Sequence, residues 1–379
     1  MYYEFGRTYF GPFLLGFTRW LNSEILQHKI NKVFFFARDG YMMEKAFKLV
    51  NHESVYEKYV YFSRKSIRQA LLHRCIDYTD SLRYISATIY ISFGGLLEYY
   101  GFDESERIRL AKSYSLDLQH DFEVNHLAAN IRVKKIYDDL REEINKKSRE
   151  QDVLLLKYIK QNDINGEVGI VDIGWQGSMQ YYLETFFAVH SLDVQLTGYY
   201  VGILPKKILL GKTYGFLYDM NNKKLRKKVL CFSGGLERMF QSLEGSTYGY
   251  KEVSGEIQPI LNTFEYADNP EIQAYIIEIQ KGALDFIVEN SNCETLDKVL
   301  CHELIRLGVA PTLKEVKLFS PFYNTDGAKE YYISQKMLYK YNFREFRHAL
   351  CNSPWKTGFL KSVLKVPFPY FWIYMLLKK

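Results

Sequence analysis

The cluster richest in chemistry-bearing residues in this 379-residue chain runs from Asp172 to Ser178 (DIGWQGS). Gly174 and Gly177 allow a tight turn and a close backbone approach, while Ser178 and the first free amides of a following helix could hold a phosphate. The cluster lacks the Gly-Lys-Ser/Thr ending of a Walker A loop and is not a GxGxxG dinucleotide fingerprint. The simpler alternative is a strand–helix turn in which Ser178 is only an N-cap.

A second cluster, Arg38-Asp39-Gly40, combines a cation, a carboxylate and a flexible residue. Arg38 could clamp a phosphate, whereas Asp39 could bind Mg²⁺ or a sugar hydroxyl, or act as a base. The alternative is an Arg–Asp pair in which Asp39 caps a helix.

Two further segments have fewer candidate groups. Ser63-Arg64-Lys65 could form a second anion clamp or a solvated basic loop. Glu237 could reach the same site from a helix start, or could stabilise the helix dipole from the first turn. The eight histidines show no spacing typical of a catalytic triad or a metal site.

Apolar segments precede the first three clusters. Residues 33–37 (VFFFA) and 168–172 (VGIVD) are continuous apolar runs, typical of strands buried on both faces. Residues 59–62 and 196–203 are predicted as further strands, and Ser66 with Gln69 predicts a capping box for the helix after the second strand. Helical spacing of apolar residues recurs between the strands.

Alternating strands and helices predict an α/β fold with a mainly parallel, Rossmann-like sheet flanked by helices. Residues 1–74 and 161–250 form this predicted core, residues 75–160 a helical insertion, and residues 251–353 a mostly helical C-terminal region. Ligands of such sheets bind outside the carboxyl ends of the strands. Because the three polar clusters fall at those ends, we expect Asp39, Arg64 and Asp172 to converge on one cleft.

Composition narrows the class of protein. Hydrophobic residues make up 47% and charged residues 25%, which excludes a disordered chain, a collagen-like fibre and a polytopic membrane protein. The five cysteines are scattered, odd in number and without a CxxC pair, so we expect reduced thiols, no zinc site and a cytoplasmic protein. The first residues do not resemble a signal peptide.

The positive charge is concentrated in two segments. Residues 205–230 contain eight Lys and Arg against one acid, and residues 355–379 contain five lysines and no acid, while the whole chain carries +6. The remainder is therefore acidic, and we expect no nucleic-acid partner. The second segment, predicted as a basic and aromatic tail at 354–379, contains an apolar run at 366–377 that is too short to span a bilayer. It suits an interfacial anchor on an anionic inner membrane leaflet, or else a segment packed on the globule.

The polar clusters belong to an ordered series of motifs: YFGP at 9–12, FFARDGY at 35–41, YFSRK at 61–65, VDIGWQGSMQ at 171–180, and Glu237 with Gly245-Ser246. Over roughly residues 5–250 the series resembles the C-terminal half of predicted haloacid-dehalogenase-like (HAD) hydrolases encoded in bacterial capsule and lipopolysaccharide clusters. Those proteins often lie beside or are fused to glycosyltransferases. The resemblance implies a role in surface-polysaccharide biosynthesis.

One departure limits what the resemblance implies. In that family the hydrolase part precedes this region and carries a DxD nucleophile motif, whereas no DxDxT follows an apolar strand here. Asp172 is followed by Ile173 and Gly174, and Asp39 by Gly40 and Tyr41. Aspartyl-phosphate chemistry is therefore not carried over to this chain.

The resulting hypothesis is a cytoplasmic protein, peripheral to the inner membrane, that binds a phosphorylated sugar or nucleotide-sugar with or without catalysis. Asp39 and Asp172 are the candidate catalytic residues and the candidate Mg²⁺ ligands. The candidate ligand-binding residues are Arg38, Gly40, Ser63, Arg64, Gly174, Trp175, Gln176, Gly177, Ser178 and Glu237.

Three alternatives stay open. An enzyme of this kind would be a hydrolase or a transferase. A phosphoribosyltransferase-like enzyme also uses a strand, an Asp, a Gly-rich loop and a helix, but the acidic-pair loop expected there is absent. The third is a non-catalytic scaffold or regulator that binds a glycosyltransferase partner, which we expect if Asp39 and Asp172 lie far apart or in buried ion pairs.

Overall fold

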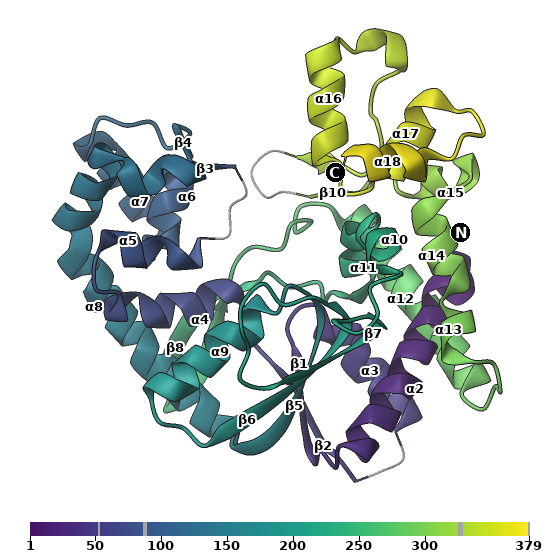
Figure 1. Cartoon of the computed structure of the whole chain (residues 1–379), viewed down its shortest axis with the longest axis horizontal. Helices are drawn as coiled ribbons and strands as arrows, with labels where there is room; N and C mark the ends of the chain where they lie inside the picture. The colour runs from purple at the N-terminus through teal and green to yellow at the C-terminus, as the bar shows by residue number, and fades with distance from the viewer. Residues whose placement is uncertain (52–53, 86–88, 325–328, 378–379) are drawn as a thin grey trace.

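The computed structural model describes residues 1–51, 54–85, 89–324 and 329–377. Its centre is a five-stranded parallel sheet in the order β2-β1-β5-β6-β7 (Figure 1). These strands are β1 (Lys32–Phe36), β2 (Tyr56–Val60), β5 (Gly166–Trp175), β6 (Val194–Ile203) and β7 (Lys212–Tyr218). The predicted α/β class, a Rossmann-like parallel sheet flanked by helices, is confirmed.

The order of the strands contains one reversal of winding. Counted in order of appearance, the five strands lie 2-1-3-4-5 across the sheet. The chain moves outward from β1 to make β2, then returns to the other side of β1 to make β5, β6 and β7. In doubly wound sheets the ligand crevice lies at the carboxyl ends of the strands where the winding reverses. Here that point lies between β1 and β5.

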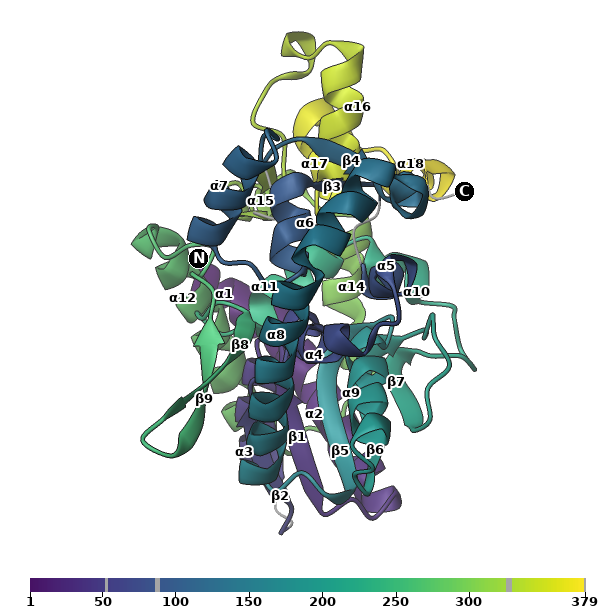
Figure 2. The same ribbon diagram turned by 90° about the vertical axis from the view of Figure 1, so that its left-hand side faces the viewer.

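Both faces of the sheet are covered by helices, as the continuous apolar strands require. Val33 and Phe35 of β1 point into one core, and Phe34 and Phe36 point into the other. The first core includes buried residues of α2 (Gly11–Gln27), α3 (Gly40–Val50) and α12 (Pro270–Asn290). The second includes α4 (Arg64–Leu71), α8 (Ile131–Gln161) and α9 (Ser178–Val189), of which α8 and α9 lie in front of the sheet in Figure 2.

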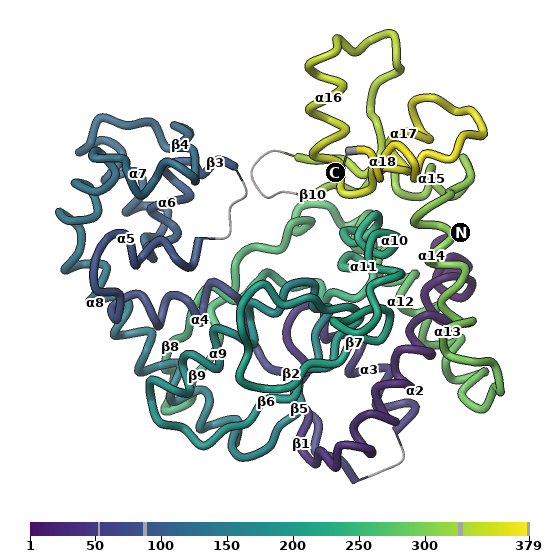
Figure 3. Tube along the Cα trace, in the orientation of Figure 1, coloured from purple at the N-terminus to yellow at the C-terminus, as the bar shows by residue number. Residues whose placement is uncertain are grey.

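The insertion between β2 and β5 forms a lobe of short elements above α4 and α8 (Figures 1 and 3). It contains η2 (Leu72–Arg74), α5 (Tyr78–Ser81), η3 (Leu82–Tyr84), β3 (Tyr90–Ser92), α6 (Phe93–Tyr99), α7 (Glu104–Ser113), β4 (Asp121–Glu123) and η4 (Val124–Ala129). β3 and β4 form an antiparallel pair inside a region predicted to be helical. The long helix α8 then leads back to the sheet.

The remaining elements surround the first core and the carboxyl edge of the sheet. At the N-terminus these are α1 (Tyr2–Phe5) and η1 (Gly6–Phe10). After β7 come α10 (Arg226–Leu230), α11 (Ser233–Phe240), β8 (Thr247–Val253), β9 (Glu256–Leu261), α13 (Asp297–Leu300), α14 (His302–Val309), α15 (Leu313–Leu318), β10 (Tyr323–Asn324), β11 (Glu330–Tyr331), η5 (Leu338–Lys340), α16 (Phe343–Asn352), α17 (Lys356–Leu364) and α18 (Tyr370–Leu377).

Several sequence predictions about local structure were wrong. The region after residue 250 is mostly helical, as predicted, but the hairpin of β8 and β9 at its start and the pair of β10 with β11 were not predicted. Strand β2 ends at Val60, since the N–H of Tyr61 donates to the hydroxyl of Tyr158 on α8. The capping box of α4 is formed by Ser63 and Ser66, not by Ser66 and Gln69. Strand β7 lies within the basic segment 205–230 and was not predicted.

The C-terminal tail packs on the globule through part of its surface. Tyr370 and Tyr374 of α18 are buried, whereas Trp372 and Leu376 on the opposite side of that helix are exposed. No helix in the described part of the chain is both long and apolar enough to cross a bilayer.

The N-terminal segment approaches α12 at two glycines. A Cβ on Gly282 would lie 2.1 Å from the carbonyl oxygen of Tyr3, and one on Gly6 would lie 2.0 Å from that of Ile279. We expect Gly282→Ala to lower the free energy of unfolding by about 1–3 kcal/mol, because backbone must move to admit the methyl group. Urea unfolding of the wild type and the variant measures this difference in the free energy of unfolding. Glu278→Ala, an exposed change on the same helix, should cost less than about 0.5 kcal/mol; equal losses would contradict the close approach.

Candidate functional site

A cavity of about 250 Å³ opens at the carboxyl edge of the sheet, where the winding reverses between β1 and β5. Polar side chains and backbone from separate elements surround it. The lining residues are Ala37, Arg38, Asp39, Ser63, Arg64, Asp172 to Gln180, Tyr200, Glu237 and Ser246. All the predicted site residues except Gly40 are among them.

Three adjacent strands deliver the central side chains. Asp39 follows β1, Arg64 opens the helix after β2, and Asp172 lies within β5. Because Val171 of β5 pairs with Phe35 of β1, Asp172 stands beside the end of β1. Neighbouring strands are about 4.8 Å apart, so groups at their ends can meet in one cavity. In the structure Asp39, Arg64 and Asp172 line one cavity, as the sequence predicts.

The segment from Asp172 to Ser178 continues the strand before it turns. β5 extends to Trp175, so Asp172 lies in the strand and not after it. Gly174 and Trp175 then adopt positive φ angles of 101° and 70°. A Cβ on Gly174 would lie 2.6 Å from the carbonyl oxygen of Gly202, so this position requires glycine. A positive φ in a bulky residue such as Trp175 is uncommon and is typical of functional sites.

The turn leaves the start of α9 open toward the cavity. Gly177, at φ 68°, occupies the N-cap position, and Ser178 is the first residue of the helix. The alternative in which Ser178 is only an N-cap is therefore wrong, and no side chain of the described residues caps α9. Ser178, Met179 and Gln180 all line the cavity. Their uncapped first-turn amides, together with the helix dipole, favour an anion at this position.

Three carboxyl groups face the same cavity and repel one another. Burial, Asp172 and Glu237 raise the pKa of Asp39 well above its usual range. Burial raises the pKa of Asp172 to about 6, although the amides of Ile173 and Gly174 and the charge of Arg64 oppose the increase. Burial also raises the pKa of Glu237. Perturbed carboxyl groups of this kind in a cleft are typical of sites that bind or react.

Glu237 reaches the cavity from α11 and not from a first helical turn. It is the fifth residue of that helix, so the dipole-stabilising alternative does not apply. The indole Nε1 of Trp175 donates to Glu237 Oε1 at 2.7 Å. This bond holds the turn after β5 against α11, with the Trp175 ring half-buried.

Of the two arginines at the cavity, Arg38 is held by an ion pair, whereas Arg64 has no such pair in the part of the chain that the structure describes. Arg38 donates to Glu265 Oε2 at 2.8 Å, and Glu265 also pairs with the buried Arg238 at 3.3 Å. Arg38 is therefore held by Glu265, so the alternative of an Arg38–Asp39 pair with Asp39 as a helix cap is wrong, and the Asp39 side chain makes no cap bond to α3. Arg64 is exposed, and no carboxylate of the described chain lies within ion-pair distance of it. It is the cation most accessible to a bound anion.

Two residues of the predicted clusters do not face the cavity. Gly40, a predicted ligand-binding residue, starts α3 and packs on Phe35, where a Cβ would lie 2.9 Å from a backbone carbon. Lys65 pairs with Glu98 of α6 at 2.5 Å and lies over the ring of Tyr248. Gly40 therefore serves the packing of α3, and Lys65 joins the insertion to the core.

Two cavity residues were not predicted from the sequence in the roles they have. Tyr200 lies opposite Asp172 in the pairing of β6 with β5, and its hydroxyl donates to Gln180 Oε1 at 2.8 Å. Gln180 Nε2 in turn donates to Glu184 at 2.8 Å. Gln180 ends the motif at 171–180, which gave it no role, and no local motif contains Tyr200. Only the register of β6 against β5 could have pointed to Tyr200.

The donors around the cavity are oxygen atoms, which suit Mg²⁺ better than a thiolate-binding metal. Among residues 1–51, 54–85, 89–324 and 329–377, no group of three or more His, Cys, Asp or Glu side chains is arranged to hold a metal ion. Mg²⁺ commonly uses one or two carboxylates and completes its shell with water and substrate phosphate. Asp39 and Asp172 fit that smaller requirement.

Two larger hollows lack this convergence of charged groups at strand ends. One of about 510 Å³ lies at the opposite end of β6, beside His28, Glu167 and Glu184. Another of about 1060 Å³ lies between the insertion and the C-terminal helices, near Tyr90 and Tyr331. Neither is at the point where the winding reverses.

No protein-family model matches the chain, and no curated protein matches it. The fold and the cavity between β1 and β5 are therefore the basis for inferring function.

The raised pKa of Asp172 predicts how stability depends on pH. Its usual value is 3.8, and the folded state keeps the proton to about 6. The contribution of Asp172 to wild-type stability therefore decreases as pH rises from about 4 to about 6, because its ionisation favours the unfolded chain. Since an asparagine side chain cannot ionise, Asp172→Asn should gain stability relative to wild type over that range, by on the order of 1 kcal/mol at neutral pH. Thermal unfolding at stepped pH values measures this.

Asp163→Asn provides a control of opposite sign. A hydrogen bond from Lys32 holds the pKa of Asp163 below its usual value. That variant should lose stability relative to wild type as pH rises. An Asp172→Asn variant that unfolds at every pH would instead give Asp172 a structural role.

Proposed function

We propose that this protein binds a phosphorylated sugar or nucleotide-sugar in the cavity between β1 and β5, in the assembly of a bacterial surface polysaccharide. The observation that carries the proposal is the convergence of Asp39, Arg64, Asp172 and the open start of α9 on one cavity. The role in polysaccharide assembly, in the cytoplasm, rests on the resemblance to HAD-like proteins of capsule and lipopolysaccharide clusters.

The cavity has separate groups for the two parts of such a ligand. The guanidinium of Arg64 and the first amides of α9 suit a phosphate or diphosphate. The carboxyl groups of Asp39 and Asp172 suit sugar hydroxyls, which donate hydrogen bonds to carboxylates. The ring of Trp175 is stacked on that of Tyr218, with 6.4 Å between the ring centroids, and adds an aromatic surface at the rim of the cavity.

The three carboxyl groups restrict how an anion enters. Fully ionised, Asp39, Asp172 and Glu237 would repel a phosphate. The raised pKa values indicate that these carboxyl groups retain protons, which relieves part of the repulsion. Asp39 and Asp172 would hold a Mg²⁺ ion, whose positive charge would relieve more of the repulsion and favour a bound phosphate. We therefore include Mg²⁺ in the proposal.

The same groups would serve a hydrolase or a transferase. Asp172 has a second candidate role that excludes holding Mg²⁺: without a bound metal, a carboxyl group whose pKa is near 6 can both accept and donate a proton near neutral pH. Asp39 would position the attacking hydroxyl as a hydrogen-bond acceptor, and a Mg²⁺ ion held there would supply charge stabilisation for the phosphate. Arg64 and the α9 amides would stabilise charge on the transferred or leaving phosphate.

The scaffold alternative is less well supported. It expects Asp39 and Asp172 to lie apart or in buried ion pairs, yet both line one cavity and neither forms an ion pair within the described residues. A glycosyltransferase partner is compatible with ligand binding.

A ligand screen tests the proposal. Sugar phosphates and nucleotide sugars are added, with and without Mg²⁺, and the thermal unfolding midpoint is measured, with calorimetry for each compound that raises it. We expect at least one compound to bind, more tightly with Mg²⁺. Arg64→Gln should weaken binding by about tenfold or more, the usual contribution of a charge-assisted hydrogen bond. Asp172→Asn should remove the increase in affinity that Mg²⁺ gives.

Arg109→Gln is the matched control, because Arg109 is an exposed arginine of the insertion at a weak 3.7 Å ion pair. It should bind as wild type does. Failure of every compound, with and without Mg²⁺, would favour the scaffold alternative. Equal binding by Arg64→Gln and wild type would remove Arg64 from the site.

A further inference from the structure

An aromatic and apolar surface on α18 faces outward on the side of the molecule that also carries α10 (Figure 2). Trp372 is 72% exposed and Leu376 is 67% exposed, one helical turn apart. Phe368, just before the helix, is also exposed. Tyr370 and Tyr374, on the opposite side of α18, are buried and fix its orientation.

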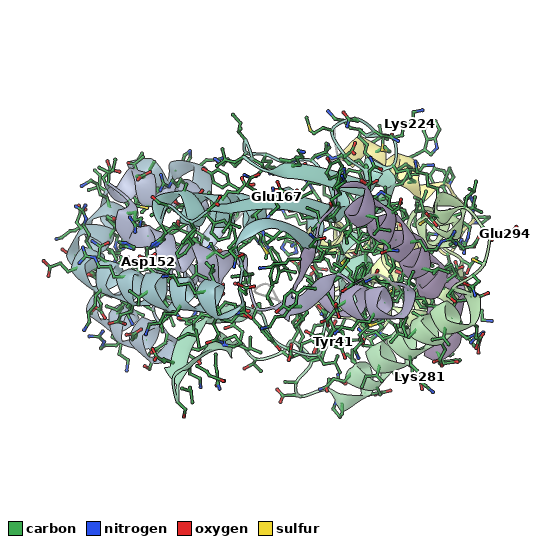
Figure 4. The ribbon with its side chains drawn as sticks, turned by 90° about the horizontal axis from the view of Figure 1, so that it is seen from below. Tyr41, Asp152, Glu167, Lys224, Lys281 and Glu294 are labelled. Carbon is green, nitrogen blue, oxygen red and sulfur yellow. The ribbon has the colours of Figure 1, made fainter. Side chains whose placement is uncertain are left out.

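A group of cations belongs to the segment that contains α10. Burial raises the pKa of Tyr374 on α18, Cys231 and Arg226 lie close enough to affect it, and its side chain shares a hollow with Leu230 and Cys231. Figure 2 shows α18 and α10 on the same side of the molecule, and Figure 4 shows Lys224 at the same edge as the C-terminal helices. The exposed cations of this segment are Lys223, Lys224, Arg226, Lys227 and Lys228.

We propose that this basic–aromatic face, made of Phe368, Trp372 and Leu376 with the five cations at 223–228, binds the surface of an anionic lipid bilayer. Indole and apolar side chains enter the boundary between headgroups and acyl chains. Lysines beside them are attracted to anionic headgroups. The face combines both features, and it does not depend on what occupies the cavity between β1 and β5.

Charge decides between a bilayer and a second copy of this chain. A symmetric dimer through this face would bring the cation groups of two copies together, because each copy presents the same patch. Within the described residues no carboxylate forms an ion pair with any of the five cations, and Asp219 accepts from the backbone amides of Asn221 and Asn222. The cations therefore favour an anionic partner, and the exposed Trp372 and Leu376 favour a lipid one.

Vesicle co-sedimentation with the full chain tests this proposal. The probes are phosphatidylcholine vesicles with and without phosphatidylglycerol, at low and high salt. We expect binding only to vesicles that contain phosphatidylglycerol, weakened by salt because the headgroup attraction is screened. Replacing Lys223, Lys224, Lys227 and Lys228 by Gln should weaken binding by at least about tenfold. Trp372→Ala should weaken it at both salt concentrations.

Two matched controls separate the face from general charge and hydrophobicity. Lys135, Lys146, Lys160 and Lys251 lie elsewhere on the chain, and their replacement by Gln removes the same charge. Ile131→Ala removes an exposed apolar side chain at the start of α8. Both should bind as wild type does, with unchanged circular dichroism spectra in all variants.

Three results would overturn the proposal. The first is that the protein binds neutral and anionic vesicles equally, and the second is that the two sets of lysine changes weaken binding equally. The third is that the wild-type protein binds no vesicles but self-associates, and that Trp372→Ala abolishes the self-association. Light scattering in the absence of vesicles detects the last. The sugar-phosphate screen is done without vesicles, so failure here leaves the proposed function unaffected.

Discussion

The candidate site depends on the reversal of winding between β1 and β5. Parallel strands need crossover connections, and here one crossover leads outward from β1 to β2 while the return passes through the insertion and α8 to β5. Helices that leave neighbouring strands in opposite directions cannot cover the strand ends between them. Asp39 and Asp172 occupy that gap, and the first turn of α9 lies beside them. Both cores serve mainly to keep these strand ends in place.

Placing three carboxyl groups in one cavity works against the stability of the fold. Burial and mutual repulsion raise the pKa of Asp39, Asp172 and Glu237, so each ionisation favours the unfolded chain. The surrounding structure offsets this in part, through the amides of Ile173 and Gly174, the charge of Arg64 and the indole of Trp175. A destabilising arrangement held by so many contacts is typical of a site kept for binding or catalysis.

Sequence reasoning found the parts of the fold that depend on short-range patterns. The apolar runs of β1 and β5 identified a buried parallel sheet, and the polar residues after them identified the cavity. It missed β7, where Lys212 and Gly215 interrupt the apolar pattern, and the hairpin of β8 and β9 at the border of a helical region. Long-range contacts were not predictable from one sequence. One example is the pairing register of β6 with β5, which sets Tyr200 beside Asp172. Another is the ion pair between Arg38 and Glu265, which are far apart in the sequence.

The cavity and the basic–aromatic face share structural elements, so they cannot be oriented independently. Trp175 of the cavity rim is stacked on Tyr218 at the end of β7, with an angle of 13° between the rings. Burial raises the pKa of Tyr218, and both Arg226 of α10 and Tyr374 of α18 influence it electrostatically. Beyond α10, only Cys231 and Phe232 separate that helix from α11, which carries Glu237. A bilayer that fixed α10 and α18 would therefore also fix α11 and the turn after β5, and with them two walls of the cavity.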